Sequence, residues 1–311
     1  MTLWQNLARM SWLSVLWNWS VRIDAPFNGF THDRDAMNAE ITPREYEEFK
    51  TFLQDACGIL LGDNKQYLVK SRLRRILEDN GLSSLGELLE RLRRSGRMGL
   101  REIVIDAMTT NETLWFRDNH PFRILQDKLL PEFAERQSLQ PLRIWSAACS
   151  TGQEPYSVSM VLDEFRQARP GKLRDVRIMA TDISKSVLEV ARKGEYEMIA
   201  IGRGLSPERQ KRYFRPSANG GWQINDQIKR MVEFKELNLL ERYMFGKFDI
   251  ILCRNVLIYF SAESKKDILT RLHGALNPGG YLILGASESL NGMPELYEMV
   301  QCQPGIVYRK K

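Results

Sequence analysis

The sequence predicts an α/β protein, an open sheet of mostly parallel strands with an N-terminal helical domain and a small inserted antiparallel β-subdomain. Four observations carry this prediction. From about residue 142 onward, short apolar runs alternate with amphipathic helical stretches. Residues 41–94 show only helical periodicity, and a loop-rich basic segment at 194–230 interrupts the later alternation. At 311 residues and 43% hydrophobic, the chain can bury the core that such an architecture needs.

The helical domain is predicted to begin near residue 41, where Thr42-Pro43-Arg44-Glu45 forms a capping box. A second helix, at about 65–79, has one apolar face, and a second capping box over 84–87 opens a third helix. The basic residues of the second helix are Lys70, Arg72, Arg74 and Arg75. They form either a solvated face or a patch for an acidic protein. Single-stranded RNA is disfavoured because no aromatic residues or glycines alternate with these charges.

A polar connecting segment, MTTNETLWFR at 108–117, follows the helices. Threonines and Asn111 precede an aromatic pair and Arg117. The segment lies between the helical domain and the first strand, where it can pass over a binding cleft. Arg117 is therefore either an ordinary surface arginine or a ligand contact.

The stretch RIWSAACSTGQEPYS at 143–157 reads as a strand, a tight turn and a helix with Pro155 at its first position. Gly152 would let the backbone approach a ligand, and a helix start favours negative charge. A single glycine is too few for the three-glycine dinucleotide fingerprint, so a pyrophosphate cradle is not expected. The unit is either plain scaffold or part of a nucleotide-like cofactor site.

Later strands end in further polar residues. Asp182 follows an apolar strand at 176–180 and is equally suited to accepting ribose hydroxyl groups and to capping the next helix. The continuous apolar run at 248–253 is typical of a buried parallel strand and leads into Asn255 and Tyr259. Ligands bind beyond the carboxyl ends of such strands, which favours both residues as ligand contacts.

Composition limits the remaining classes of function. The four cysteines form no CxxC pair and accompany only three histidines, so neither a zinc site nor a disulfide framework is predicted and a cytoplasmic location fits. Cys149 is read as a packing residue rather than a nucleophile. No run reaches the roughly 18 apolar residues of a membrane span. The net charge of +6 makes nucleic acid, a membrane surface or an acidic protein the candidate partners.

The first residues stand apart from the rest. Residues 10–21 resemble a signal-peptide core but lack a small-residue cleavage site, and Met37 looks like an ordinary start. Residues 1–36 are either a loose extension or an upstream misreading of the start. We therefore expect an extension at 1–38, a helical domain at 39–108 and a catalytic domain at 109–311, with the β-subdomain at about 195–231.

Taken together, the motifs resemble the chemotaxis receptor glutamate O-methyltransferase family, the CheR type. The matching text is TTNETLWFRD (109–118), WSAACSTGQEPYS (145–157), ATDIS (180–184), NLLE (238–241), FDIILCRNVLIYF (248–260) and LNPGGYLILGASESL near the end. The similarity covers roughly residues 40–308.

The resemblance implies a Rossmann-like S-adenosylmethionine-dependent methyltransferase sheet, with S-adenosylhomocysteine as the cofactor's product. The cofactor contacts that it implies are Asn111, Thr113, Arg117, Glu154, Asp182, Asn238, Leu239, Arg254 and Asn255. Arg117 and Tyr259 would face the transferring methyl group as the catalytic pair. The basic second helix would meet the cytoplasmic domain of a chemoreceptor, an acidic helical substrate, and no metal is implied. In some family members the β-subdomain binds a peptide tether at the receptor's C-terminus, but the short β-subdomain here favours recognition without a tether. We also expect the enzyme to be a monomer.

The chemistry agrees with this resemblance. A glutamate carboxylate, with a pKa of about 4.3, is ionised at neutral pH and needs no general base. Two alternatives stay open: a methyltransferase acting on RNA, which the pI of 9.1 favours, and a regulatory module that binds the cofactor without catalysis.

Overall fold

The computed structural model describes residues 40–94, 99–136, 140–173, 175–290 and 292–311. The predicted extension at 1–38 lies outside these residues. Within the described part of the chain, none of the helices has the length and apolar character needed to cross a membrane.

Four helices form the N-terminal part of this region: α1 (Pro43–Cys57), α2 (Gln66–Asp79), α3 (Leu85–Arg94) and α4 (Leu100–Met108). The capping box predicted at the start of α1 is present, because Glu45 N donates to Thr42 Oγ1 and Thr42 N donates to Glu45 Oε2. The second box is only half formed. Glu87 N donates to Ser84 Oγ, but the Glu87 carboxylate accepts from Ser83 N instead.

The larger sheet has seven strands in the order β6-β2-β1-β7-β8-β10-β9. They are β1 (Leu142–Ala147), β2 (Val176–Asp182), β6 (Val232–Glu236), β7 (Phe248–Cys253), β8 (Leu276–Leu284), β9 (Tyr297–Cys302) and β10 (Gly305–Lys310). The first five strands of the order pair in parallel, whereas β10 pairs antiparallel with both β8 and β9. The predicted α/β fold with a mostly parallel sheet is confirmed.

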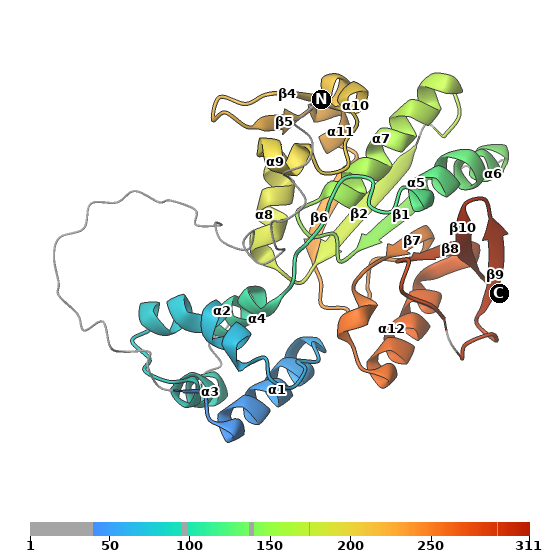
Figure 1. The fold of residues 1–311 in the computed structure, drawn as a ribbon. Coiled ribbons are helices and arrows are strands. Elements are labelled where there is room, and N and C mark those ends of the chain that lie inside the picture. The colour runs from blue at the N-terminus through green and yellow to red at the C-terminus, as the bar shows by residue number, and fades with distance from the viewer. Residues whose placement is uncertain (1–39, 95–98, 137–139, 174, 291) are drawn as a thin grey trace, which may run out of the picture. The chain divides into compact units, whose positions relative to one another are not determined.

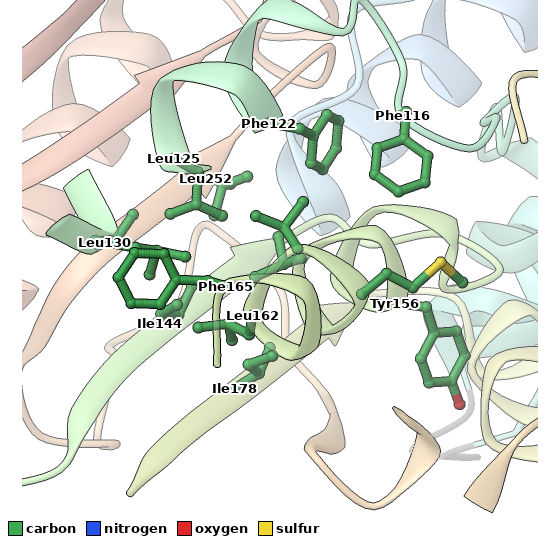
Figure 2. Close-up of a cluster of buried hydrophobic side chains, with 14 of the residues drawn as sticks. Phe116, Phe122, Leu125, Leu130, Ile144, Tyr156, Leu162, Phe165, Ile178 and Leu252 are labelled. Carbon is green, nitrogen blue, oxygen red and sulfur yellow. The ribbon is translucent and has the colours of Figure 1, made fainter. Parts of the chain in front are cut away.

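Apolar side chains alternate along the strands and build a core on each face of the sheet. Ile144 and Leu252 pack with α7 (Gln153–Ala168) and the segment α5 (His120–Ile124), η1 (Leu125–Leu129) and α6 (Leu130–Glu135) (Figure 2). Trp145 and Ile251 point to the opposite face, where α12 (Ala262–Ala275) lies (Figure 1). Helix α7 begins at Gln153, so Pro155 is its third residue rather than its first. Proline is tolerated there because N–H groups in the first turn have no partner within the helix.

The predicted insertion is also confirmed. After α8 (Lys185–Lys193), a three-stranded antiparallel sheet contains β3 (Glu195–Tyr196), β5 (Trp222–Ile224) and β4 (Phe214–Pro216). Short helices α9 (Met198–Ile201), α10 (Pro207–Tyr213) and α11 (Asp226–Lys229) accompany it. The buried carboxylate of Asp163 in α7 anchors this β-subdomain, because Tyr213 Oη and Gln227 Nε2 donate to it at 3.0 and 2.8 Å.

Candidate functional site

A cleft lies at the carboxyl ends of the parallel strands, where the strand order reverses. From β1 the chain proceeds to β2 and β6 on one side, and β7 and β8 lie on the other. The last residues of β1 and β7, Ala147 and Cys253, are register partners. Connections leaving these two strands diverge, which opens a crevice of the kind that binds ligands in α/β sheets.

The cleft contains about 1010 Å³ of empty space, its open mouth included. All ten residues that the sequence singled out as cofactor contacts or catalytic groups line it: Asn111, Thr113, Arg117, Glu154, Asp182, Asn238, Leu239, Arg254, Asn255 and Tyr259. Their contacts with a cofactor stay a prediction, but the fold brings them together from segments up to 148 positions apart in the chain (111 to 259).

The turn after β1 has alternating left-handed backbone: φ is 58° at Ala148, 52° at Ser150 and 93° at Gly152. Ala148 and Ser150 line the cleft, whereas Gly152 does not. A Cβ at Gly152 would lie 2.9 Å from the Ala191 side chain. Glycine is therefore required here for its backbone conformation and for packing, and the expectation that Gly152 brings the backbone up to a ligand is wrong.

Asp182, at the end of β2, does not cap the next helix, and its binding of ribose hydroxyls stays a prediction. Ser184 caps α8, because its hydroxyl accepts from Val187 N, so capping by Asp182 is wrong. The Asp182 carboxylate instead accepts from Ser150 N at 2.8 Å and from Ser184 N at 3.0 Å. Burial raises the pKa of Asp182, while these N–H groups oppose that shift. Each oxygen retains acceptor capacity for a hydroxyl group from the cleft.

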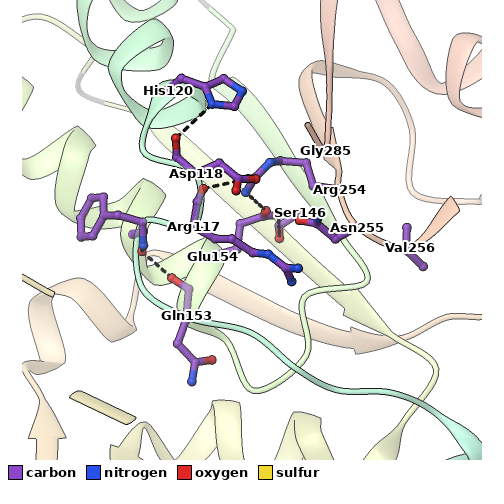
Figure 3. Close-up of polar contacts among 12 residues, drawn as sticks. Arg117, Asp118, His120, Ser146, Gln153, Glu154, Arg254, Asn255, Val256 and Gly285 are labelled. Carbon is purple, nitrogen blue, oxygen red and sulfur yellow. Dashed lines mark hydrogen bonds and ion pairs between the residues drawn. The ribbon is translucent and has the colours of Figure 1, made fainter. Parts of the chain in front are cut away.

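Arg254, directly after β7, is held in a buried ion-pair network (Figure 3). Its Nη1 donates to Glu154 at 2.8 Å, and its Nη2 donates to Asp118 at 2.7 Å and to the Arg117 carbonyl at 2.8 Å. Ser146 Oγ completes the shell of Glu154 at 2.8 Å. Of the three guanidinium nitrogens of Arg254, the buried Nε is the one that has no partner among the described residues.

The helical domain supplies part of the cleft wall. Cys57 and Ile59, at and just beyond the end of α1, line the cleft. Two hydrogen bonds hold this wall in place: Asn238 Nδ2 donates to the Ala56 carbonyl at 2.9 Å, and Leu60 N donates to the Tyr259 carbonyl at 2.8 Å. The Asn238 side chain therefore joins the helical domain to the cleft, in addition to any contact that it makes with the cofactor.

The four basic residues of α2 do not share one environment. Arg72 is partly buried, and its Nη1 donates to the carbonyls of Met108 and Thr109 at 2.7 and 2.9 Å. Arg74 and Arg75 are exposed and pair with Glu78 and Asp79 one turn later in the helix. Lys70 is half-buried. Arg72 thus supports the start of the segment that lines the cleft.

Sequence reasoning missed two acidic residues beside the cleft. Asp118 pairs with Arg254, and Glu288 accepts hydrogen bonds from the loop after β7. Both fall within the family-like motif text, but the residues after β7 that they contact are at least 31 positions away, so no local pattern indicated a role. Cys149 was read correctly as a packing residue: it is buried, and burial raises the pKa of its thiol well above the ordinary value.

Comparisons with known proteins agree with this geometry. Residues 111–306 match the family model described as CheR methyltransferase, SAM binding domain, and residues 44–109 match CheR methyltransferase, all-alpha domain. The chain is 57% identical over 269 residues to chemotaxis protein methyltransferase Cher2 of Pseudomonas putida. The aligned region covers 86% of this chain and 98% of the relative. Chemotaxis protein methyltransferase 1 of Pseudomonas aeruginosa is 58% identical with the same coverage. Chemotaxis protein methyltransferase 1 of Vibrio cholerae is 53% identical, and that alignment covers 87% of this chain and 98% of the relative.

The predicted cofactor, S-adenosylmethionine, is confirmed by the match to a SAM binding domain. The groups in the cleft fit its chemistry. A carboxylate with spare acceptor capacity suits ribose hydroxyls, and apolar side chains such as Ile183 and Leu239 suit a flat base. The unpartnered Nε of Arg254 and the guanidinium of Arg117 suit a carboxylate or other acceptor.

Proposed function

Because the chain belongs to the CheR methyltransferase family, we propose that it methylates glutamate side chains of chemoreceptors and forms methyl esters there. Methylation that depends on S-adenosylmethionine and serves chemotaxis is the activity of this family. The glutamate carboxylate as acceptor, and the residues that carry the reaction, are our proposal.

One observation carries the choice of acceptor: each carboxylate among the described residues that line the cleft already has a hydrogen-bond or ion-pair partner. Among the described residues that line it, none is histidine or lysine. Glu154 is bonded to Ser146 and Arg254, and Glu112 lies at the surface and pairs with Arg203. Asp182 accepts two backbone N–H groups. An acceptor that must lose a proton before attack would have to give it to one of these already bonded carboxylates, whereas a glutamate carboxylate arrives ionised.

The bound cofactor supplies an electrophilic methyl group on a sulfonium centre. The protein's contribution is then mainly alignment of the acceptor with that group, and such positioning can lower a barrier by about 7–11 kcal/mol. We assign Arg117 to orienting the acceptor carboxylate, since a guanidinium binds a carboxylate through two parallel hydrogen bonds. Arg117 Nη1 donates to the Glu112 carbonyl at 3.0 Å, which tethers the side chain at the cleft. Tyr259 would donate a hydrogen bond beside the reacting atoms.

The same proposal assigns cofactor binding to the residues that line the cleft. Asp182 would accept the ribose hydroxyls, and Asn111, Thr113, Asn238 and Asn255 would provide the remaining polar contacts. Leu239 would pack against the base. Glu154 would contact the cofactor and would also hold the Arg254 guanidinium in place.

We place the receptor-binding surface on α2, with the acidic cytoplasmic helices of a chemoreceptor as partner. Lys70, Arg74 and Arg75 are the cationic groups that a docking helix would meet, and Arg72 belongs to the same helix but also donates to the Met108 carbonyl. Docking requires that the receptor's carboxylates replace Glu78 and Asp79 as partners of the arginines, since those pairs are exposed and weak. The enzyme would act in the cytoplasm as a monomer, without a receptor tether.

The test is incubation with methyl-labelled S-adenosylmethionine and membranes that carry chemoreceptors, followed by mild alkali. We expect label on the receptor band and its release as volatile methanol, because methyl esters hydrolyse in alkali. Label that resists alkali would indicate a nitrogen acceptor and would contradict the proposal. Label on RNA would favour an RNA methyltransferase, and cofactor binding without transfer would favour a regulatory module.

A further inference from the structure

One carboxylate organises the loop that follows β7. Glu288 lies in the turn after β8, and its Oε2 accepts from Asn255 N at 2.7 Å and from Gly285 N at 2.8 Å. Its Oε1 accepts from Val256 N at 2.9 Å and from Leu257 N at 2.7 Å. Three successive backbone N–H groups of one loop therefore converge on a single side chain.

This loop forms one side of the cleft, where Asn255 and Val256 are lining residues (Figure 3). Asn255 has left-handed backbone with φ of 58°, a conformation that is uncommon outside glycine, although asparagine adopts it more readily than most residues. Hydrogen bonds to a charged acceptor are about twice as strong as neutral ones. The Glu288 carboxylate is thus well suited to hold the loop in this uncommon conformation.

The approach of β8 to β7 is shaped for the same contact. A Cβ at Gly285 would lie 2.6 Å from Glu288 Oε2 and 2.8 Å from Asn255 N. Any larger residue at Gly285 would enter the space in which the carboxylate meets the loop. The absence of a side chain at Gly285 therefore allows the Glu288 carboxylate, three residues later, to reach the loop.

We propose that Glu288 is a positioning residue of the cofactor cleft, which fixes Asn255 and Val256 for binding of the cofactor. Glu288 itself is not among the residues that line the cleft, so it acts through the loop. This inference rests on the proposed assignment of the cleft to the cofactor, and it does not depend on which acceptor is methylated.

The test compares Glu288→Gln with wild type in binding of S-adenosylhomocysteine, measured by calorimetry. Glutamine keeps one acceptor oxygen but turns the other into an N–H₂ group that faces two N–H donors. We expect affinity to fall about tenfold or more, since buried donors lose their acceptor. Glu132→Gln is the matched control, because Glu132 also accepts two hydrogen bonds, from Tyr281 and Arg136, but does not line the cleft.

Gly285→Ala provides the second variant, since it keeps every acceptor but forces the Glu288 carboxylate and the backbone of Asn255 apart. It should weaken binding in the same direction, which covers the case in which Glu288→Gln does not fold. If both folded variants bind within twofold of wild type, or lose only melting temperature as the control does, the inference is overturned. Wild type that binds S-adenosylhomocysteine yet methylates no receptor would contradict the proposed function alone.

Discussion

The guanidinium of Arg254 and the carboxylate of Glu154 meet at 2.8 Å across the point where the strand order reverses. Arg254 follows β7, Glu154 lies in the first turn of α7 after β1, and the arginine side chain is only 1% exposed. The pair joins the two chain segments that diverge around the cleft. It therefore links the stability of the fold to the geometry of the site.

Removing one partner of this pair should be costly. Glu154→Gln leaves a buried arginine with only Asp118 to compensate its charge, so we expect the free energy of unfolding to fall by about 3 kcal/mol. Urea denaturation measures this. Glu90→Gln is the control, because its exposed pair with Arg94 should contribute less than about 1 kcal/mol. An equal decrease in the free energy of unfolding in both variants would contradict a stabilising role for the Arg254–Glu154 pair.

Tyr259→Phe tests the proposed catalytic pair. The variant keeps the ring that lines the cleft and loses only the hydroxyl group, so turnover should fall by about tenfold or more, while affinity for S-adenosylhomocysteine stays within threefold. Steady-state kinetics with receptor membranes and calorimetry separate the two quantities. Unchanged turnover would remove Tyr259 from the mechanism.

Asp182 predicts a pH dependence of cofactor binding. Burial raises its pKa above the ordinary value of 3.8, so the carboxylate becomes protonated earlier than usual as the pH falls. A protonated acid accepts ribose hydroxyls less well, and affinity for S-adenosylhomocysteine should therefore decrease on acidification, starting above pH 3.8. Asp182→Asn should bind about tenfold more weakly and lose this pH dependence. A pH profile that the variant reproduces would assign the titration to another group.

Protonation of Asp182 should affect stability in the opposite sense. A raised pKa means that the folded state holds the proton more tightly than the unfolded chain, so acidification through this pKa relieves an unfavourable charge. Loss of affinity at acid pH can thus be separated from unfolding by recording the melting temperature in the same buffers.

Arg72 and Arg74 form a matched pair on α2 that distinguishes support of the cleft from receptor docking. Arg72→Lys loses the forked contact with the Met108 and Thr109 carbonyls, so we expect weaker binding of S-adenosylhomocysteine, by about fivefold. Arg74→Lys changes an exposed residue and should leave that affinity unaltered. Both should be measured for KM toward receptor membranes as well. If Arg72→Lys changes only the KM for receptor membranes, the bonds from Arg72 to the Met108 and Thr109 carbonyls do not support the cleft.

The sequence alone determined the classes of element and the composition of the site. Local signals were sufficient for the capping box at Thr42 and for the buried strand at 248–253, because capping and hydrophobic periodicity act over a few residues. The resemblance in the motif text identified ten residues that the fold brings into one cleft. Boundaries were less certain, and α7 begins two residues before the proline expected to start it.

Only the tertiary structure decided what each of these residues contacts. Asp182 was an equally good candidate for a helix cap until the structure showed that Ser184 caps α8 and that Asp182 accepts from Ser150 N in the turn after β1. Asn238 reaches Ala56, 182 positions away, and Glu288 reaches back to the loop at Asn255. Such contacts depend on the order in which strands pair, and that order is set by long-range packing that no local pattern records. The residue types of the cleft can therefore be read from the chain, whereas the network that positions them follows from the sheet order.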